Sequence, residues 1–369
     1  MSNNKNNRNN KSSKNNKNNR NNKSSKNTRN NNVNESSLLI VIGFLVIVLL
    51  IIFHKRSKKI EPYQNNKRLV VFIKDKKMSP FGDIPSEFKK LNDNNETLSV
   101  TFDNLETRYK NYKRDYGIKI FYPHSSLYSD PYIMSRLKGR EDNGVKVINT
   151  TKIMDLILDK HDLKKKISEM DNVDKIVIGE GKYNTNTINL IQNLLSTKTI
   201  VIKAIGDTTS SGDLPKNSEY IDIKNTIPPL LEKTNTDKFI IEEYLEYVRI
   251  HRVLVINGIP LNYTFIYNNN DNNMSSKFDE ESMILIKKPN NSIINLARKV
   301  FNNLHDDIGN NYKGVVAVDI YQTKRGKIYV SDINPIDNVM KYQNLAREKL
   351  SNWRDWNISK KIAQHLNRV

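Results

Sequence analysis

Short apolar runs separated by polar stretches recur along the chain from residue 68 onward. The runs at 68–74, 117–123 and 144–149 have the length and the Val, Ile and Phe content of strands, and the stretches between them have helix-like spacing. Strands that alternate with helices are typical of α/β folds with a parallel sheet. The pattern therefore predicts a small parallel-sheet domain over residues 68–150.

The second half of this region begins with a helical pattern and then becomes rich in strands. Residues 150–170 place Ile153, Leu156 and Ile157 at helical spacing, with Thr150 or Thr151 as the N-cap. An amphipathic helix is predicted at 292–304. Strands are predicted at 175–179, 199–204, 238–245, 251–258, 260–267 and 282–288, and packing helices at 343–350 and 359–366. The fold class is α/β (α+β), with a domain over 151–340 and packing helices over 341–369.

The last predicted hairpin, GVVAVDIYQTKRGKIYVSDINP at 314–335, carries polar residues among its apolar ones. If its turn pairs Gln322 with Lys327, Asp319 and Asp332 become diagonal neighbours on one face, and Asn334 shares that face by the strand period. Burial of these oxygens is costly unless a positive charge compensates it, and Mg²⁺ takes such ligands. The alternative is a hairpin whose acids lie near its solvated ends.

The N-terminal part of the chain has no globular pattern. Residues 1–35 consist mostly of Asn, Lys, Ser and Arg, so we expect a disordered basic tail there that contacts anionic lipid or nucleic acid. Residues 36–53 carry no charged side chain, which predicts a transmembrane helix over 36–54, followed by a basic juxtamembrane linker over 55–67. The expected localisation is a membrane, crossed once, with the catalytic domain on the cytoplasmic side, or a virion or host membrane if the chain is viral.

The amino-acid composition excludes some kinds of catalytic and metal-binding site. The 369 residues include 60 Lys+Arg, 40 Asp+Glu and no Cys, so disulfides, thiolate nucleophiles and Cys-bound metals are excluded.

Two further stretches carry candidate ligand-binding residues. The strand at 199–204 contains Lys203 and leads into a loop whose backbone could cover phosphate oxygens, with Gly206, Ser210, Ser211 and Gly212. No Walker A signature follows. The alternative is an ordinary Gly/Ser hairpin with a solvated lysine.

The second stretch, 238–258, is an apolar segment that turns polar at Glu242 and Glu243 and continues to Arg252. Its first part could present an adenine-binding edge, and Arg252 could point at phosphates. The alternatives are an exposed loop and an arginine paired to a carboxylate. Lys160 lies upstream of this stretch and, considered by itself, is interpreted as a surface lysine.

Taken together and in order, these residues resemble the ATP-grasp superfamily over about residues 140–340. The match consists of Lys160 after the GVKVIN strand and its helix, Lys203 before a Gly/Ser loop, Glu242 through Leu245 as an E-x-x-L hinge, Arg252, and the D…D-x-N hairpin. The resemblance implies ATP and Mg²⁺, with two ions, as cofactors, and it implies that the domain over 68–150 helps to bind the substrate. Asp319, Asp332 and Asn334 would bind the metal, and Lys160, Lys203, Glu242, Glu243, Leu245, Arg252 and the loop 206–212 would bind the nucleotide. Lys203 and Arg252 would be catalytic.

Three functions remain open within that resemblance. The Asp-Ile-Asn motif is similar to the inositol trisphosphate 5/6-kinases and favours phosphoryl transfer to an anionic substrate. The first alternative is a carboxylate–amine ligase, similar to glutathione synthetase-like enzymes, which acts through an acylphosphate. The second is an inactive, membrane-tethered binding or scaffold protein.

Overall fold

The structure is a computed structural model that describes residues 67–75, 81–112, 116–204, 228, 231–232, 237–268, 283–286, 289–306, 314–336, 339–351, 354 and 357–369. The chain divides into two units, Met1–Tyr63 and Gln64–Val369, and every described residue belongs to the second. The predicted tail 1–35 and membrane segment 36–54 therefore lie outside the described residues, as does the linker except for its last residue.

The predicted membrane localisation is wrong on the evidence of the described ranges. In them, no helix is both long enough and apolar enough to cross a bilayer.

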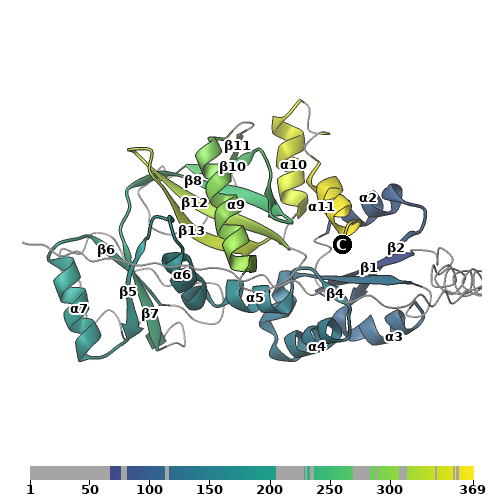
Figure 1. The fold of residues 1–369 in the computed structure, drawn as a ribbon, viewed down its shortest axis with the longest axis horizontal. Helices are drawn as coiled ribbons and strands as arrows, with labels where there is room; N and C mark the ends of the chain where they lie inside the picture. Colours follow the sequence, from purple (N-terminus) through teal and green to yellow (C-terminus); the bar gives the residue numbers. More distant parts are fainter. Residues whose placement is uncertain are drawn as a thin grey trace, which may run out of the picture. The chain divides into compact units, whose positions relative to one another are not determined.

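A four-stranded parallel sheet opens the described part, with the strand order β2-β1-β3-β4 (Figure 1). Residues 69–73 of its inner strand β1 are all buried, as expected for a parallel strand covered on both faces. Its strands are β1 (Arg68–Lys74), β2 (Asn95–Thr101), β3 (Ile118–Pro123) and β4 (Lys146–Val147), and its helices are α2 (Ile84–Leu91), α3 (Leu105–Lys110) and α4 (Pro131–Asp142), with 3₁₀ turns at Phe102–Asn104 and Ser125–Ser129. The parallel sheet expected from the sequence is present.

Two helices follow where the sequence predicts one. Thr150 caps α5 (Thr151–Leu158) as expected, its side chain accepting from the backbone N–H of Ile153 at 3.3 Å. The helix then stops at Asp159, which leaves helical geometry (φ −76°, ψ 88°) and caps α6 (Lys160–Glu169) by accepting from the Asp162 N–H at 3.0 Å. This break places Lys160 in the first turn of a new helix.

A small antiparallel sheet of three strands comes next, in the order β5-β7-β6. The helix α7 (Thr185–Leu195) covers it, and Ile191 packs in the same apolar cluster as Ile202 and Phe239. The strands are β5 (Val177–Lys182), β6 (Ile200–Ala204) and β7 (Lys238–Glu243).

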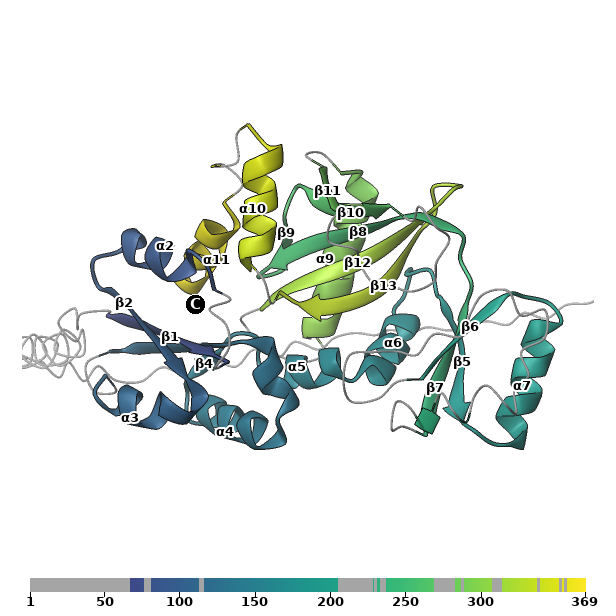
Figure 2. The same ribbon diagram turned by 180° about the vertical axis from the view of Figure 1, so that it is seen from behind.

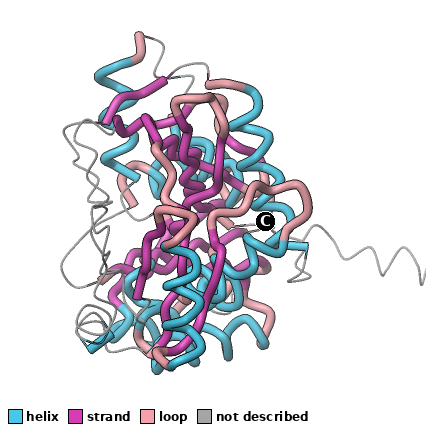
Figure 3. Tube along the Cα trace, turned by 90° about the vertical axis from the view of Figure 1, so that its left-hand side faces the viewer, coloured by secondary structure: helices cyan, strands magenta, loops and turns pink. Residues whose placement is uncertain are grey.

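The largest sheet is antiparallel, in the order β11-β10-β8-β12-β13, with β9 paired to β8. Figure 1 shows α9 (Asn291–Asp306) across one face of this sheet, and Figure 2 shows the opposite face. Figure 3 shows the same chain from the side, with helices, strands and loops in different colours. The α9 face buries Val253, Val316 and Val318, whereas the opposite face packs with α10 (Val339–Lys349) and α11 (Ile358–Leu366). The strands are β8 (Tyr247–Ile256), β9 (Ile259–Pro260), β10 (Thr264–Asn268), β11 (Met283–Ile286), β12 (Val315–Thr323) and β13 (Ile328–Pro335).

One buried side chain joins the parallel sheet to the large sheet. Asn149, two residues after the end of β4, accepts from the backbone N–H of Val315 and donates to its carbonyl at 3.0 Å. A Cβ on Gly314 would lie only 1.8 Å from the Asn149 Oδ1 atom. The glycine is therefore required for this close approach at the start of β12.

Candidate nucleotide and metal site

Three charged residues form one row across three neighbouring strands of the large sheet. The register pairs Asp319 of β12 with Arg252 of β8 on one side and with Asp332 of β13 on the other. The guanidinium of Arg252 binds Asp319 through two hydrogen bonds of 2.7 Å, from Nε to Oδ1 and from Nη2 to Oδ2. Because Asp319 is only 1% exposed, this fork compensates a charge that burial would otherwise penalise.

The hairpin register differs from the predicted one. Gln322 pairs with Ile328, not Lys327, and the ladder shifts between Asp319 and Ile320. This bulge makes Asp319 and Asp332 direct partners; without it, the Gln322–Ile328 register would pair Asp319 with Ser331 and turn Asp332 to the opposite face. The expected sharing of one face is still met.

Asn334 and Lys160 complete the group. Asn334 donates from Nδ2 to Asp319 Oδ2 at 2.9 Å and accepts at Oδ1 from the Lys160 ammonium, also at 2.9 Å. The same ammonium donates to Asp332 Oδ1 at 2.9 Å and to the Ile333 carbonyl at 2.8 Å. Lys160 is thus no surface lysine: the first turn of α6 delivers it to the hairpin.

The charge of Asp332 is stabilised by two lysines. Burial acts to raise the pKa of its carboxyl, but the positive charges of Lys160 and Lys164, together with hydrogen bonds from Lys160 and the Ile333 N–H, outweigh burial and lower the pKa. Asp332 is therefore ionised at neutral pH and available as an oxygen ligand.

The hinge residues lie at the end of β7, and the structure gives them partners that the sequence did not suggest. Glu242 is 2% exposed and forms a buried ion pair with Lys164 of α6. Glu243 forms an exposed pair with Lys198 at 2.7 Å, and the Leu245 carbonyl accepts from the Tyr247 N–H at 2.8 Å. Sequence reasoning missed Lys164, although its place four residues after Lys160 puts both lysines on one side of α6.

Two hollows flank these groups. The first lies beside the buried ion pair and is lined by Lys164, Ile167, Ser168, Lys175, Ile176, Val177, Glu242, Val330 and Ser331. The second lies at the carboxyl end of β3, where ligands of parallel sheets commonly bind, and reaches Pro335 directly after Asn334. Its described lining contains no Lys, Arg, Asp or Glu: Phe81, Tyr122, Pro123, His124, Ser125, Tyr128, Asn149, Met154, Val315, Pro335, Ile336 and Val339.

The remaining predicted residues are only partly described. The backbone of Lys203 lies in β6 and pairs with Ile240 of β7. Gly206, Ser210, Ser211 and Gly212 lie outside the described residues.

Comparison with known proteins finds no matching family model and no match among curated protein sequences. Solved structures do match. The D-alanine–D-alanine ligase of Bacillus anthracis superposes with a TM-score of 0.54 at 14% identity, over 82% of this chain and 96% of that one, and its complex with ATP gives 0.53. D-cycloserine synthetase DcsG gives 0.57 at 10% identity, over 82% and 99%. The macrocyclase MdnC of Microcystis aeruginosa, bound to its precursor peptide MdnA, gives 0.53 at 11% identity, over 82% and 100%.

The chain has the ATP-grasp fold.

On that ATP-grasp fold, the structure brings together five of the predicted residues: Lys160, Arg252, Asp319, Asp332 and Asn334. Two carboxylates and an amide oxygen on one face form the hard oxygen donor set that Mg²⁺ takes. The residues present therefore fit this metal.

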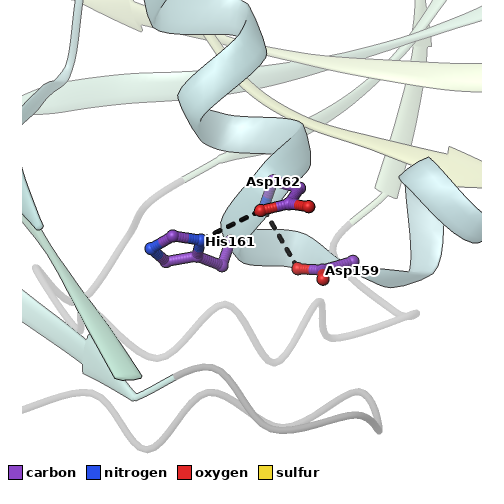
Figure 4. A group of neighbouring side chains, drawn as sticks. All are labelled: Asp159, His161 and Asp162. Carbon is purple, nitrogen blue, oxygen red and sulfur yellow. Dashed lines mark hydrogen bonds and ion pairs between the residues drawn. The ribbon is translucent and has the colours of Figure 1, made fainter. Parts of the chain in front are cut away.

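A second group of potential metal ligands, Asp159, His161 and Asp162, lies at the start of α6 (Figure 4). Its contacts have a structural explanation: Asp159 caps the helix, and His161 reaches Asp162 at 3.2 Å and Glu180 of β5 at 3.1 Å. We assign no ligand to it.

Proposed function

We propose that this chain is an ATP-dependent ligase that activates a carboxylate as an acylphosphate and transfers it to an amine. The observation that carries the proposal is the charged row of Arg252, Asp319 and Asp332, together with a hollow at the end of β13 whose described lining contains no Lys, Arg, Asp or Glu. The row suits a metal-bound triphosphate, and the described lining of the hollow suits contact with an organic group that is not densely charged.

The metal would be held by Asp319, Asp332 and Asn334. Magnesium bound there would neutralise phosphate oxygens and orient the terminal phosphate. Lys160 already contacts Asp332 and Asn334, so its ammonium is within reach of phosphates at the same place. Catalysis of this kind rests mainly on positioning and charge neutralisation, so a Ser/His/Asp triad is unnecessary.

The base of the nucleotide would lie against the mouth of the hollow beside Glu242. Its walls come from α6, β13 and the segment that leads into β5, and Ile176 and Val177 offer apolar contact to a planar ring. The backbone after β7 would supply the edge that reads adenine, because the carboxylate of Glu242 is already paired with Lys164.

The described lining of this hollow favours the ligase over the kinase interpretation. An inositol phosphate carries several negative charges and requires a cluster of Lys and Arg to bind it. The described lining of the hollow offers none. The names of the similar structures, two of amino-acid ligases or synthetases and one of a peptide macrocyclase, support the same choice.

The test is to incubate the full-length protein with Mg-ATP, hydroxylamine and a panel of amino acids and peptides. A ligase releases phosphate and ADP and forms a hydroxamate from the trapped acylphosphate. We expect Asp332→Ala to lower this turnover by about 10²–10³-fold, the usual loss for a missing electrostatic partner of the reacting groups. Asp155→Ala, which removes an exposed acid of α5, is the matched control. A phosphorylated product without hydroxamate would favour the kinase interpretation. The absence of any ATP turnover would favour the interpretation as an inactive scaffold protein.

A further inference from the structure

Both carboxylates of the row already carry protein cations, but Asp319 is the more tightly held. The fork of Arg252 occupies one lone pair on each of its oxygens, and Asn334 takes another on Oδ2. At 1% exposure, Asp319 gains little from water. Arg252 is itself mostly covered, with 14% of its side chain exposed.

A third group fixes the guanidinium from behind. Its Nη1 donates to the Tyr342 hydroxyl of α10 at 3.0 Å, and the Tyr342 ring packs on Phe265 of β10 at 4.8 Å between centroids. Tyr342 is 7% exposed, so the hydroxyl position is set by packing. Arg252 is therefore held from two sides, by a carboxylate and by a phenol.

This arrangement disfavours a free divalent cation at Asp319. Such an ion would lie next to a guanidinium that cannot lose its proton, in a site where charges are weakly screened. The guanidinium must move before the metal enters, and its movement requires a new anionic partner. A nucleotide brings that partner, because its phosphates accept the arginine fork as well as a carboxylate does.

We infer that Arg252, positioned by Tyr342, keeps Asp319 closed to free divalent cations, so that the metal enters only together with a nucleotide. This inference rests on the proposed function for the identity of the site. In it, Tyr342 is a positioning residue that acts through Arg252.

The experiment measures Mn²⁺ binding to the full-length protein without nucleotide, by the loss of the free-ion EPR signal. Arg252→Met keeps the apolar stem and removes the charge, and we expect it to bind Mn²⁺ at least tenfold more tightly than the wild type. Arg249→Met changes an exposed arginine near the start of the same strand; it is the matched control and should leave Mn²⁺ affinity unchanged. Tyr342→Phe should tighten Mn²⁺ binding about two- to threefold, without a change in the far-UV CD spectrum.

Two further variants keep the test decisive. Arg252→Met/Asp319→Asn should lose the gain in Mn²⁺ affinity. If Arg252→Met does not fold without metal, Arg252→Lys replaces it: Lys keeps one contact and loses the fork, so a smaller tightening is expected. Restored folding of Arg252→Met by Mn²⁺ alone would also support the inference.

Equal Mn²⁺ affinity in wild type, Arg252→Met and Arg252→Lys would overturn the inference. If the wild type still shows full ligase turnover in that case, the proposed function is kept and only this inference is rejected. Conversely, if Arg252→Met binds Mn²⁺ more tightly but the wild type shows no ligase turnover, this inference is kept and the proposed ligase function is rejected.

Discussion

Two ion pairs in this chain are buried to nearly the same extent but are built differently. Lys164 and Glu242 expose 10% and 3% of their side chains, and Arg252 and Asp319 expose 14% and 1%. The first pair links α6 to the end of β7. The second belongs to a row in which Asn334 and Tyr342 also take part.

The difference separates a pair that holds two elements together from a pair whose partners can be exchanged. Breaking the buried Lys164–Glu242 pair would leave a charge without compensation, which is enough to explain why the pair is retained. A pair with additional partners on both sides can exchange one partner for another. The Arg252 network has that property, and it lies on the face where Asp332 and Lys160 meet.

The largest effect is expected at the Lys164–Glu242 pair. Glu242→Ala should lower the free energy of unfolding by about 3–5 kcal/mol, because Lys164 is left buried without its partner. Lys164→Met/Glu242→Leu should recover most of that loss, since both charges are removed together. Urea denaturation at pH 7 measures both. A double variant as unstable as Glu242→Ala would contradict the view that the pair is structural.

A smaller loss is expected where the second pair shares its partners. Tyr342→Phe removes one hydrogen bond to a charged group and should reduce the free energy of unfolding by about 1.5–3 kcal/mol. The same variant in an Arg252→Met background should cost much less, because the hydroxyl then has no guanidinium to bind. A double-mutant cycle of Tyr342→Phe and Arg252→Met, measured by urea denaturation, gives the coupling free energy between the two residues. If the two losses of stability simply add, Tyr342 does not act through Arg252.

The residues of these two ion pairs could not be predicted equally well from the sequence. The acids of the hairpin, the Thr150 cap and the lysine–hinge–arginine order follow from local patterns and from the ATP-grasp resemblance. Lys164 opposite Glu242 does not, because the contact joins residues 78 positions apart. The bulge that aligns Asp319 with Asp332, the break at Asp159 and the β8–β12 pairing that places Arg252 beside Asp319 are tertiary choices with no local signature.

The stability of the fold is also expected to depend on pH through Asp332, which lies in the same row as Arg252 and Asp319. The pKa of Asp332 is lowered in the folded state, because Lys160 and Lys164 outweigh the effect of burial. The stability that this carboxylate contributes is therefore fully present above the unfolded-state pKa of about 3.9 and is lost as the pH falls through the lower folded-state value. Asp332→Asn should flatten the fall in thermal stability below about pH 4 relative to the wild type. An unchanged acid limb would show that Asp332 does not carry this dependence.

The smallest effect is expected at the exposed Lys198–Glu243 pair, next to the Lys164–Glu242 pair. Glu243 adjoins Glu242 in β7 and pairs with Lys198 at 2.7 Å, but the two side chains are 39% and 43% exposed. Water screens this pair and keeps either partner solvated when the other is removed, so Lys198→Ala should change the free energy of unfolding by only about 0–1 kcal/mol. Both pairs join a lysine to one of two neighbouring glutamates at the same strand end, and they differ mainly in burial. If Lys198→Ala cost as much as Glu242→Ala, burial would not be the cause of the large effect, and the distinction between the two kinds of pair would fail.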